Sequence, residues 1–264
     1  MRNRVLLTML AAVLALLPAV PARAAPPQLR VLTFNACGNV CRLGEVDVTT
    51  RNIVYQVRGR NAAVAMVQEL CFTQFLVLRN RLAKYGYRAV FGAATNGGRC
   101  ANDLDRHGRG FGVAILARGP LSGQVVHRLP APHGSPEEGR VVLAVTARLP
   151  GRTVFLATTH TAPRGPNLDV QLGALRGWLT PISRTRPVIF GGDLNVTPRN
   201  RHLDGFYAGF HEANNDRLEP LPTFTRGGSK IDYLFAGTSH FRPRGAATSC
   251  TAYSDHCMYL GIFQ

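Results

Sequence analysis

The sequence predicts an α/β fold in which two β-sheets pack face to face and helices cover their outer faces. Apolar segments of strand length recur along the 264 residues, several of them apolar at almost every position, whereas few stretches have helical spacing. Continuously apolar strands are typical of sheets buried on both faces, and many strands with few helices favour two packed sheets. We therefore expect helices outside a pair of sheets.

Nine segments have the length and composition of strands, and most are bounded by Gly, Pro or Asn. In chain order they are Leu29–Phe34, Ala62–Val67, Tyr87–Ala93, Phe111–Leu116, Val141–Ala147, Val154–Thr159, Val188–Phe190, Ile231–Ala236 and Met258–Phe263. Helices are expected near Asp47–Val57, Thr73–Tyr85 and Leu168–Leu179, and in the second of these Phe75, Leu78 and Leu82 recur at helical spacing. The polar, glycine-rich segment Ala94–Arg109 is expected to be a long surface loop.

The first 24 residues have the features of a cleaved signal peptide. Arg2 and Arg4 precede the apolar segment Val5–Val20, and Ala22-Arg23-Ala24 supplies the small residues of a cleavage site. A membrane anchor is the alternative, but the apolar run is short for a span, and no other run is long enough to cross a bilayer. We therefore expect a secreted protein with a single domain over residues 25–264, monomeric and with no stable membrane anchor.

All six cysteines lie in the expected mature chain, and an even number is typical of disulfides in an oxidising compartment. No CxxC pair or Cys/His ligand spacing indicates zinc. Six cysteines allow 15 pairings, so the connectivity stays open. The short spacings favour Cys37–Cys41 and Cys250–Cys257, which leaves Cys71–Cys100.

The chain is strongly basic, with a formal charge of +16. Without Arg2, Arg4 and Arg23 it keeps 28 basic against 15 acidic residues, or +13. Such a charge outside the cell suggests a polyanionic partner, either nucleic acid or an anionic membrane surface. An arginine-rich coding bias explains the composition equally well, because Lys84 and Lys230 are the only lysines.

Three acids, Glu69, Asp193 and Asp232, follow or lie within the most apolar segments, and a fourth, Asp255, comes shortly before one. A carboxylate at the end of a buried strand costs desolvation energy unless it is compensated, although any one of them could simply cap a turn. Polar residues neighbour three of these acids: Gln68 precedes Glu69, Asn195 lies two residues after Asp193, and His256 follows Asp255. Two further polar side chains, Asn35 and His160, end strands of their own. If the strand ends converge, the carboxylates repel one another unless a cation neutralises them. Oxygen donors suit Mg²⁺ or Mn²⁺, so the sequence predicts a metal-assisted hydrolase.

Seven motifs occur in order: LTFN ending at Asn35, VQE ending at Glu69, GVAI at 112–115, THT around His160, GGDLN at 191–195, KIDY at 230–233 and SDH ending at His256. Together they resemble the endonuclease/exonuclease/phosphatase superfamily, also called the deoxyribonuclease I-like fold. The resemblance runs from about Leu29 to the C-terminus, and the family's four-layered α/β sandwich agrees with the expected sheets and helices.

The resemblance implies a role for each of these residues. Glu69 would be the principal ligand of Mg²⁺ or Mn²⁺, helped by Asn35 and Asp255, with Ca²⁺ as an alternative structural ion. Asp193 and Asn195 would bind around the scissile phosphate and orient the attacking water. His256, held by Asp232, would be a general base or stabilise the phosphate. His160 would bond the phosphate or protonate the leaving oxygen.

The subfamily is less defined. His160 resembles the residue of deoxyribonuclease I and the sphingomyelinases rather than that of the abasic-site repair enzymes, and Thr159–Pro163 is closer to the secreted nucleases. Arg109 and Arg164, together with Arg99 and Arg106, are candidate phosphate contacts, with solvated surface arginines as the alternative. The remaining histidines have no motif, and surface or core positions are expected for His107, His127, His133, His202, His211 and His240.

These observations favour a secreted nuclease that cuts DNA, with RNA as a further substrate. A sphingomyelinase of the phospholipase C type, or a phosphatase on a smaller phosphoester, is the alternative on the same fold. A sphingomyelinase would need an exposed apolar or aromatic hairpin, and the one tryptophan, Trp178, lies in a helix-like stretch instead. A non-enzymatic binding module disagrees with the intact set of acids, amides and imidazoles.

Overall fold

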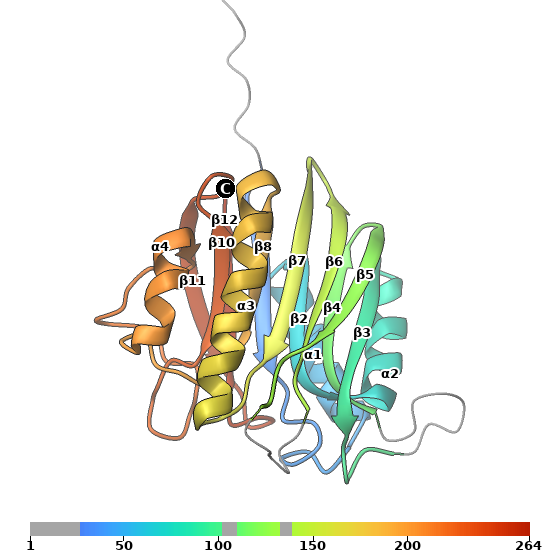
Figure 1. The fold of residues 1–264 in the computed structure, drawn as a ribbon. Coiled ribbons are helices and arrows are strands. Elements are labelled where there is room, and N and C mark those ends of the chain that lie inside the picture. The colour runs from blue at the N-terminus through green and yellow to red at the C-terminus, as the bar shows by residue number, and fades with distance from the viewer. Residues whose placement is uncertain (1–26, 102–109, 133–138) are drawn as a thin grey trace, which may run out of the picture.

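Residues 27–101, 110–132 and 139–264 are described by the computed structural model, and they form two six-stranded sheets (Figure 1). The first sheet contains β1 (Leu29–Asn35), β2 (Val64–Cys71), β3 (Tyr87–Asn96), β4 (Gly110–Arg118), β11 (Pro243–Cys250) and β12 (Cys257–Phe263) in the order β11-β12-β1-β2-β4-β3. The second contains β5 (Leu121–Arg128), β6 (Val141–Leu149), β7 (Arg152–His160), β8 (Val188–Asp193), β9 (Phe210–Glu212) and β10 (Asp232–Gly237) in the order β5-β6-β7-β8-β10-β9. The expected signal peptide, residues 1–24, lies outside the described residues.

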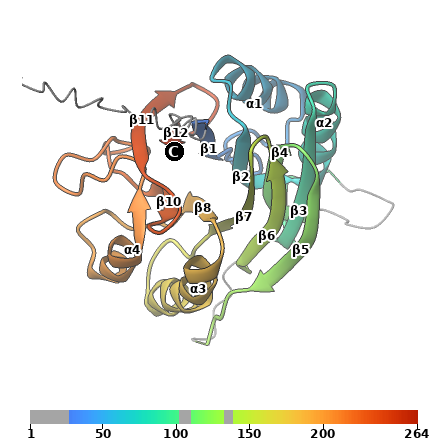
Figure 2. The ribbon, with the colours of Figure 1, turned by 90° about the horizontal axis from the view of Figure 1, so that it is seen from above.

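Helices cover the outer face of each sheet, so the expected four-layered sandwich is confirmed (Figure 2). Helices α1 (Asp47–Gly59) and α2 (Phe72–Ala83) pack on the first sheet, and α3 (Pro166–Thr185) and α4 (Asp204–Gly209) pack on the second, with a 3₁₀ turn at Arg201–Leu203. No helix among the described residues is long and apolar enough to span a bilayer.

Three apolar layers separate these four layers, and the period of two in each strand divides the side chains among them. In β2, Val64 and Met66 belong to the core between the sheets, while Ala65 and Val67 belong to the core under α1 and α2. A third core lies between the second sheet and helices α3 and α4. Because both faces of the central strands are buried, their sequences are continuously apolar.

Three strands were absent from the sequence-based expectation: β5, β9 and β11. β5 is an edge strand that is exposed at nearly every position, and β11 is at the edge of the first sheet and only half-buried. Such strands bury too few side chains to leave an apolar run, and β9 is only three residues long. β3 also extends to Asn96, so the expected loop from Ala94 begins later.

The pairing of the strands brings the polar strand ends to one rim of the sandwich. β1 and β2 run parallel, with Asn35 opposite Gln68, and β7 and β8 run parallel, with His160 opposite Asp193. β10 is antiparallel to β8 and starts at this rim, so that Asp232 lies opposite Asp193. Residues at the ends of five strands therefore converge.

A fully buried ion pair supports this rim from behind. Lys230 Nζ lies 3.3 Å from Glu212 Oε1, donates to the Asp232 carbonyl at 3.0 Å and sits 3.5 Å from the centre of the Tyr259 ring. The Glu212 carboxylate also accepts hydrogen bonds from the Tyr259 hydroxyl and from two backbone N–H groups. Because both side chains are buried away from water, each charge of the pair compensates the other.

Replacing Lys230→Met should lower the free energy of unfolding by about 3–5 kcal/mol, because it leaves the Glu212 carboxylate buried and unpaired. The double variant Lys230→Met/Glu212→Gln should regain most of this loss, since no buried charge remains and the amide oxygen still accepts hydrogen bonds. Urea unfolding followed by circular dichroism measures both. Lys84→Met, at the exposed second lysine, is the matched control. If Lys230→Met destabilised the protein as little as Lys84→Met does, the prediction would be contradicted.

Candidate active site

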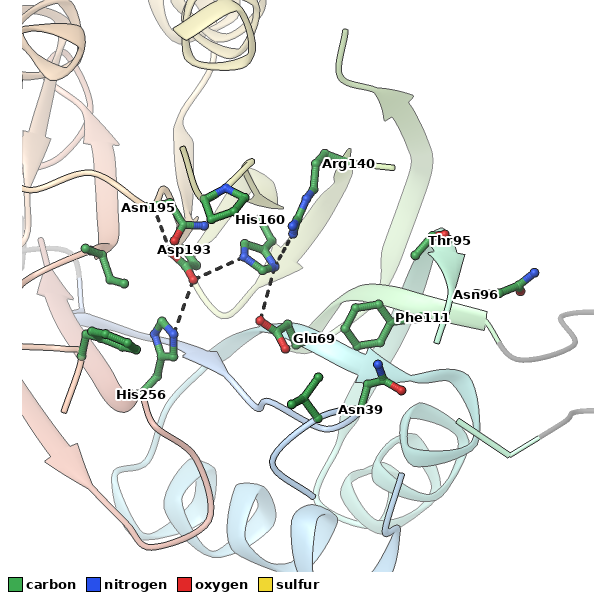
Figure 3. Close-up of a pocket in the computed structure, with 14 residues that line it drawn as sticks. Asn39, Glu69, Thr95, Asn96, Phe111, Arg140, His160, Asp193, Asn195 and His256 are labelled. Carbon is green, nitrogen blue, oxygen red and sulfur yellow. Dashed lines mark hydrogen bonds and ion pairs between the residues drawn. The ribbon is translucent and has the colours of Figure 1, made fainter. Parts of the chain in front are cut away.

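A cavity of about 590 Å³ opens at the rim where the strand ends converge (Figure 3). Five of the residues expected from the sequence line it: Glu69, His160, Asp193, Asn195 and His256. Asn35 and Asp232 contact these residues from below, and Asp255 lies beside His256 without lining the cavity. The lining also includes residues that the sequence did not suggest: Asn39, Val40, Thr95, Asn96, Phe111, Arg140, Pro163, Phe224 and Ile231.

The buried amide of Asn35 connects the two sheets at the floor of the cavity. Its Nδ2 donates to Glu69 Oε1 at 2.9 Å in the first sheet and to Asp193 Oδ2 at 3.1 Å in the second, while its Oδ1 accepts the Cys37 N–H. A second link runs from Gln68 Nε2 to Thr158 Oγ1 at 2.9 Å. Because these groups are buried, their hydrogen bonds hold the carboxylates in position.

Two site residues have left-handed backbone conformations that are uncommon outside glycine. Glu69 (φ +52°) sits where the pairing of β2 with β4 shifts register, and its carbonyl accepts the Gly38 N–H at 2.9 Å. Asn195 (φ +54°) donates its own N–H to Asp193 Oδ1 at 2.9 Å. Strained backbone of this kind is concentrated at functional sites, where the surroundings enforce it.

The second glycine of the GGDLN motif, Gly192, lets β7 and β8 approach closely. Gly192 has φ +137°, and a Cβ atom there would lie 2.0 Å from the Thr159 carbonyl oxygen. A side chain at this position would push the two strands apart. Gly192 therefore keeps Asp193 directly opposite His160.

His256 is held by two buried carboxylates. Its Nδ1 donates to Asp232 Oδ2 at 2.9 Å, and its Nε2 lies 3.6 Å from Asp193 Oδ2. Burial lowers the pKa of His256, but the charges of Asp232, Asp193 and Asp255 more than offset it and raise that pKa to about 9. Burial and the neighbouring Asp232 also raise the pKa of Asp193 to about 7. The pair therefore contains a charged imidazole and a carboxyl that accepts a proton readily.

His160 differs from His256 because its neighbour is a cation. Arg140 Nη1 lies 2.7 Å from His160 Nδ1, and since a guanidinium can only donate, this ring nitrogen accepts. The neutral imidazole then carries its proton on Nε2, which is 3.4 Å from Asp193 Oδ2. Burial, Arg140 and His256 together lower the pKa of His160 well below its ordinary value. The two imidazoles thus present Nε2–H groups to the same carboxylate in different charge states.

Arg140 has no motif, and sequence reasoning missed it. It immediately precedes β6, which pairs with β7, so its side chain reaches the same rim as His160. The rule that selected the acids, a charge next to a long buried strand, also applies to Arg140 and would have found it.

The remaining candidates are placed less centrally. Arg164 is exposed and next to Pro163, and Arg99 is exposed, with its backbone N–H bonded to Asn39 Oδ1. Arg106, Arg109, His107 and His133 lie outside the described residues. His127 stacks on Trp178, His202 pairs with Asp169, His211 is half-buried and His240 is exposed, as expected for histidines without a motif.

The donor set fits a hard divalent cation. Burial raises the pKa of Glu69 more than the Asn35 hydrogen bond and the charges of His256 and Arg140 lower it, so its carboxylate is incompletely compensated. Asp232 Oδ1 is buried and has no hydrogen-bond partner among the described residues. Two groups of possible metal ligands occur in the described part of the chain. One is Asp193, Asp232 and His256; the other is Asp255 with Cys37 and Cys41, whose sulfurs are joined in a disulfide and cannot act as thiolate ligands.

The three favoured disulfides, Cys37–Cys41, Cys71–Cys100 and Cys250–Cys257, are confirmed. Each adjoins a site residue: the first follows Asn35, the second follows Glu69, and the third encloses Asp255 and His256. The bridges therefore restrain the loops at the rim of the cavity.

A model of the Endonuclease/Exonuclease/phosphatase family matches residues 32–256, which include every one of the site residues above. The chain belongs to this family. A search of curated proteins gives no significant match.

Several solved structures share the fold of this chain. The human nocturnin catalytic domain with bound sulfate has a TM-score of 0.72 at 20% identity, covering 90% of this chain and 93% of that chain. A mannosyl-6-phosphatase from Bacteroides thetaiotaomicron gives 0.68 at 16% identity, covering 89% and 99%. TDP2 from D. rerio, in complex with a single-stranded DNA product, gives 0.67 at 16% identity, covering 90% and 99%. At these identities the likeness shows the fold alone.

His160→Ala and His256→Ala should each lower the turnover rate by about 10²-fold or more, as loss of a catalytic imidazole usually does. Because both rings act on one step beside Asp193, the double variant should lose far less than the product of the two losses. Steady-state kinetics on a phosphodiester measures this, with the exposed His240→Ala as the matched control. Near-normal turnover of His160→Ala would exclude a two-histidine site.

The three disulfides should contribute differently to stability and activity. Removing Cys71–Cys100, which spans 29 positions, should cost the most stability, about 3–4 kcal/mol from loop entropy. Removing Cys250–Cys257 should mainly reduce activity, because the short loop carries His256. Paired Cys→Ser variants, compared by thermal unfolding and by kinetics, separate the two effects. The reverse ranking in both measurements would show that the short loop does not restrain the site.

Proposed function

We propose that this protein is a secreted phosphodiesterase that requires Mg²⁺ or Mn²⁺ and cuts DNA, with RNA as a further substrate. The observation that carries the proposal is the convergence of Glu69, Asp193, His160 and His256 in one open cavity. This set contains an acidic group for a metal ion, a proton acceptor and two hydrogen-bond donors. Those are the functions that hydrolysis of a phosphodiester requires.

Glu69 would hold the metal ion with the help of Asn35, and the neighbouring Asp255 adds negative charge to the same region. When bound, the ion would supply positive charge against the phosphate and its leaving oxygen. The oxygen ligands favour Mg²⁺ or Mn²⁺ over zinc.

The two imidazoles and Asp193 would divide the remaining work. His256, as an imidazolium paired with Asp232, would donate to a non-bridging phosphate oxygen and stabilise its growing charge. Asp193, with a pKa near 7, would accept the proton of the attacking water, next to the Asn195 side chain that lines the cavity. Neutral His160 would donate from Nε2 to the phosphate, while Arg140 fixes its tautomer.

Three further observations support a nucleic acid substrate and secretion. The expected mature chain carries a charge of +13, which favours a polyanion. The D. rerio TDP2 structure has single-stranded DNA as its product on the same fold. Three disulfides and the signal-like residues 1–24 favour an oxidising compartment outside the cell.

Chelation should abolish hydrolysis, and Mg²⁺ or Mn²⁺ should restore it, because the acidic residues alone would repel the phosphate. Glu69→Gln should reduce activity by about 10²-fold or more without unfolding the protein, whereas the exposed Glu219→Gln should have no effect. Hydrolysis assays on plasmid, single-stranded DNA and RNA, each with and without EDTA, measure this. Full activity in EDTA would exclude the metal mechanism.

The same assay should include sphingomyelin vesicles and mannose 6-phosphate. Hydrolysis of either one in place of all three nucleic acids would assign the cavity to a lipid or a small phosphoester. We expect the nucleic acids to be cut and both of these to remain intact.

A further inference from the structure

A second groove, with a volume of about 500 Å³, lies between α1 and the connection from β11 to β12. Two exposed tyrosines line it, Tyr55 at 74% and Tyr253 at 39% exposure. The rest of its lining is polar or charged apart from one valine: Asp47, Val48, Arg51, Asn52 and Gln56. We call this the tyrosine groove.

The tyrosine groove adjoins the candidate active site through two connections. Tyr253 is three residues from His256 and lies in the same disulfide-closed loop. Asn52 Nδ2 donates to Thr251 Oγ1 at 3.4 Å, which joins α1 to that loop. In Figure 2 the connection between β11 and β12 lies beside α1. The Arg42 guanidinium lies 5.7 Å from the centre of the Tyr253 ring, and the same β1–α1 connection places Val40 in the catalytic cavity. One loop therefore borders both cavities.

The tyrosine groove does not repel a polyanion. Its single carboxylate, Asp47, forms ion pairs with Arg51 at 2.9 Å and with Arg81. Arg42 adds a further positive charge next to Tyr253. A phosphate backbone that leaves the active site along this side would meet arginines.

One exposed aliphatic side chain, Val48, lines this groove together with the two tyrosines. Aliphatic residues would suit a lipid surface as well, but the groove itself combines two aromatic rings with the amides of Asn52 and Gln56. Aromatic rings stack on bases, and amides can bond to base edges.

We propose that the tyrosine groove binds a nucleobase of single-stranded nucleic acid that extends from the active site. This inference rests on the proposed nuclease function. Tyr253 is three positions before His256, so their Cα atoms lie at most about 11 Å apart, a span of a few nucleotides. The groove therefore selects strands whose bases are unpaired near the scissile phosphate.

The test is binding without cleavage, measured by fluorescence anisotropy in EDTA at fixed salt. The probes are a 12-nucleotide oligothymidylate and a strand of equal length with abasic sites throughout. Tyr55→Ala and Tyr253→Ala should each weaken binding of the oligothymidylate by at least about fivefold, as loss of a stacking partner does, and leave the abasic strand unaffected. Tyr253→Phe should retain binding, and Tyr253→Leu should lose it, because stacking needs a ring. Leu218→Ala is the matched control, at the same 74% exposure as Tyr55.

The outcomes distinguish a failure of the groove proposal from a failure of the proposed nuclease function. The groove proposal would be overturned if the tyrosine variants bound the oligothymidylate as tightly as the wild type. It would also be overturned if they lost as much affinity for the abasic strand, or if Tyr253→Leu kept full affinity. Tyrosine-dependent binding to phosphatidylserine vesicles without base-dependent binding to DNA would assign the surface to lipid and also overturn it. Hydrolysis of bis-p-nitrophenyl phosphate, compared between wild type and the tyrosine variants, should be unchanged. A wild type that cuts no nucleic acid but shows base-dependent binding would refute the nuclease proposal alone.

Discussion

The packing of two sheets through one apolar layer is the interaction on which the site depends. Side chains such as Met66 and Leu156 bury their surface in this layer, and the effect grows with the area removed from water. Once the sheets are packed, the ends of strands from both sheets open on one rim. Asn35 then has carboxylates of both sheets within hydrogen-bond distance. The site is therefore a consequence of how the layers meet.

Burial gives this rim its chemistry. Asp193 and Asp232 are almost completely removed from solvent, at 1% and 0% exposure, so their charges interact strongly with each other and with the imidazoles. The pKa values of the two histidines move in opposite directions: burial and the nearby Arg140 lower that of His160, whereas the carboxylates around His256 outweigh its burial and raise that of His256. One cavity thus holds both a donor and an acceptor near neutral pH.

The same rim is also where the backbone departs from regular geometry. Glu69 and Asn195 are left-handed, β2 shifts register at Glu69, and three disulfides restrain the adjoining loops. The buried Lys230–Glu212 pair adds a rigid support under Asp232. Strain and buried charge persist where surrounding contacts compensate them, and here the four layers do so.

The sequence alone determined the layers and most of the site, because burial on two faces leaves continuous apolar runs and because the motifs place acids, amides and imidazoles at strand ends. The short spacings favoured one disulfide pairing among the 15 possible, and the structure decided in its favour. Tertiary structure alone decided what depends on contacts between distant segments. β5 and β11 have no apolar pattern, and Arg140 acquires its role only from the ring of His160. Tyr55 and Tyr253, 198 positions apart, line one groove. Such pairings depend on the packed layers, since no local pattern brings those side chains together.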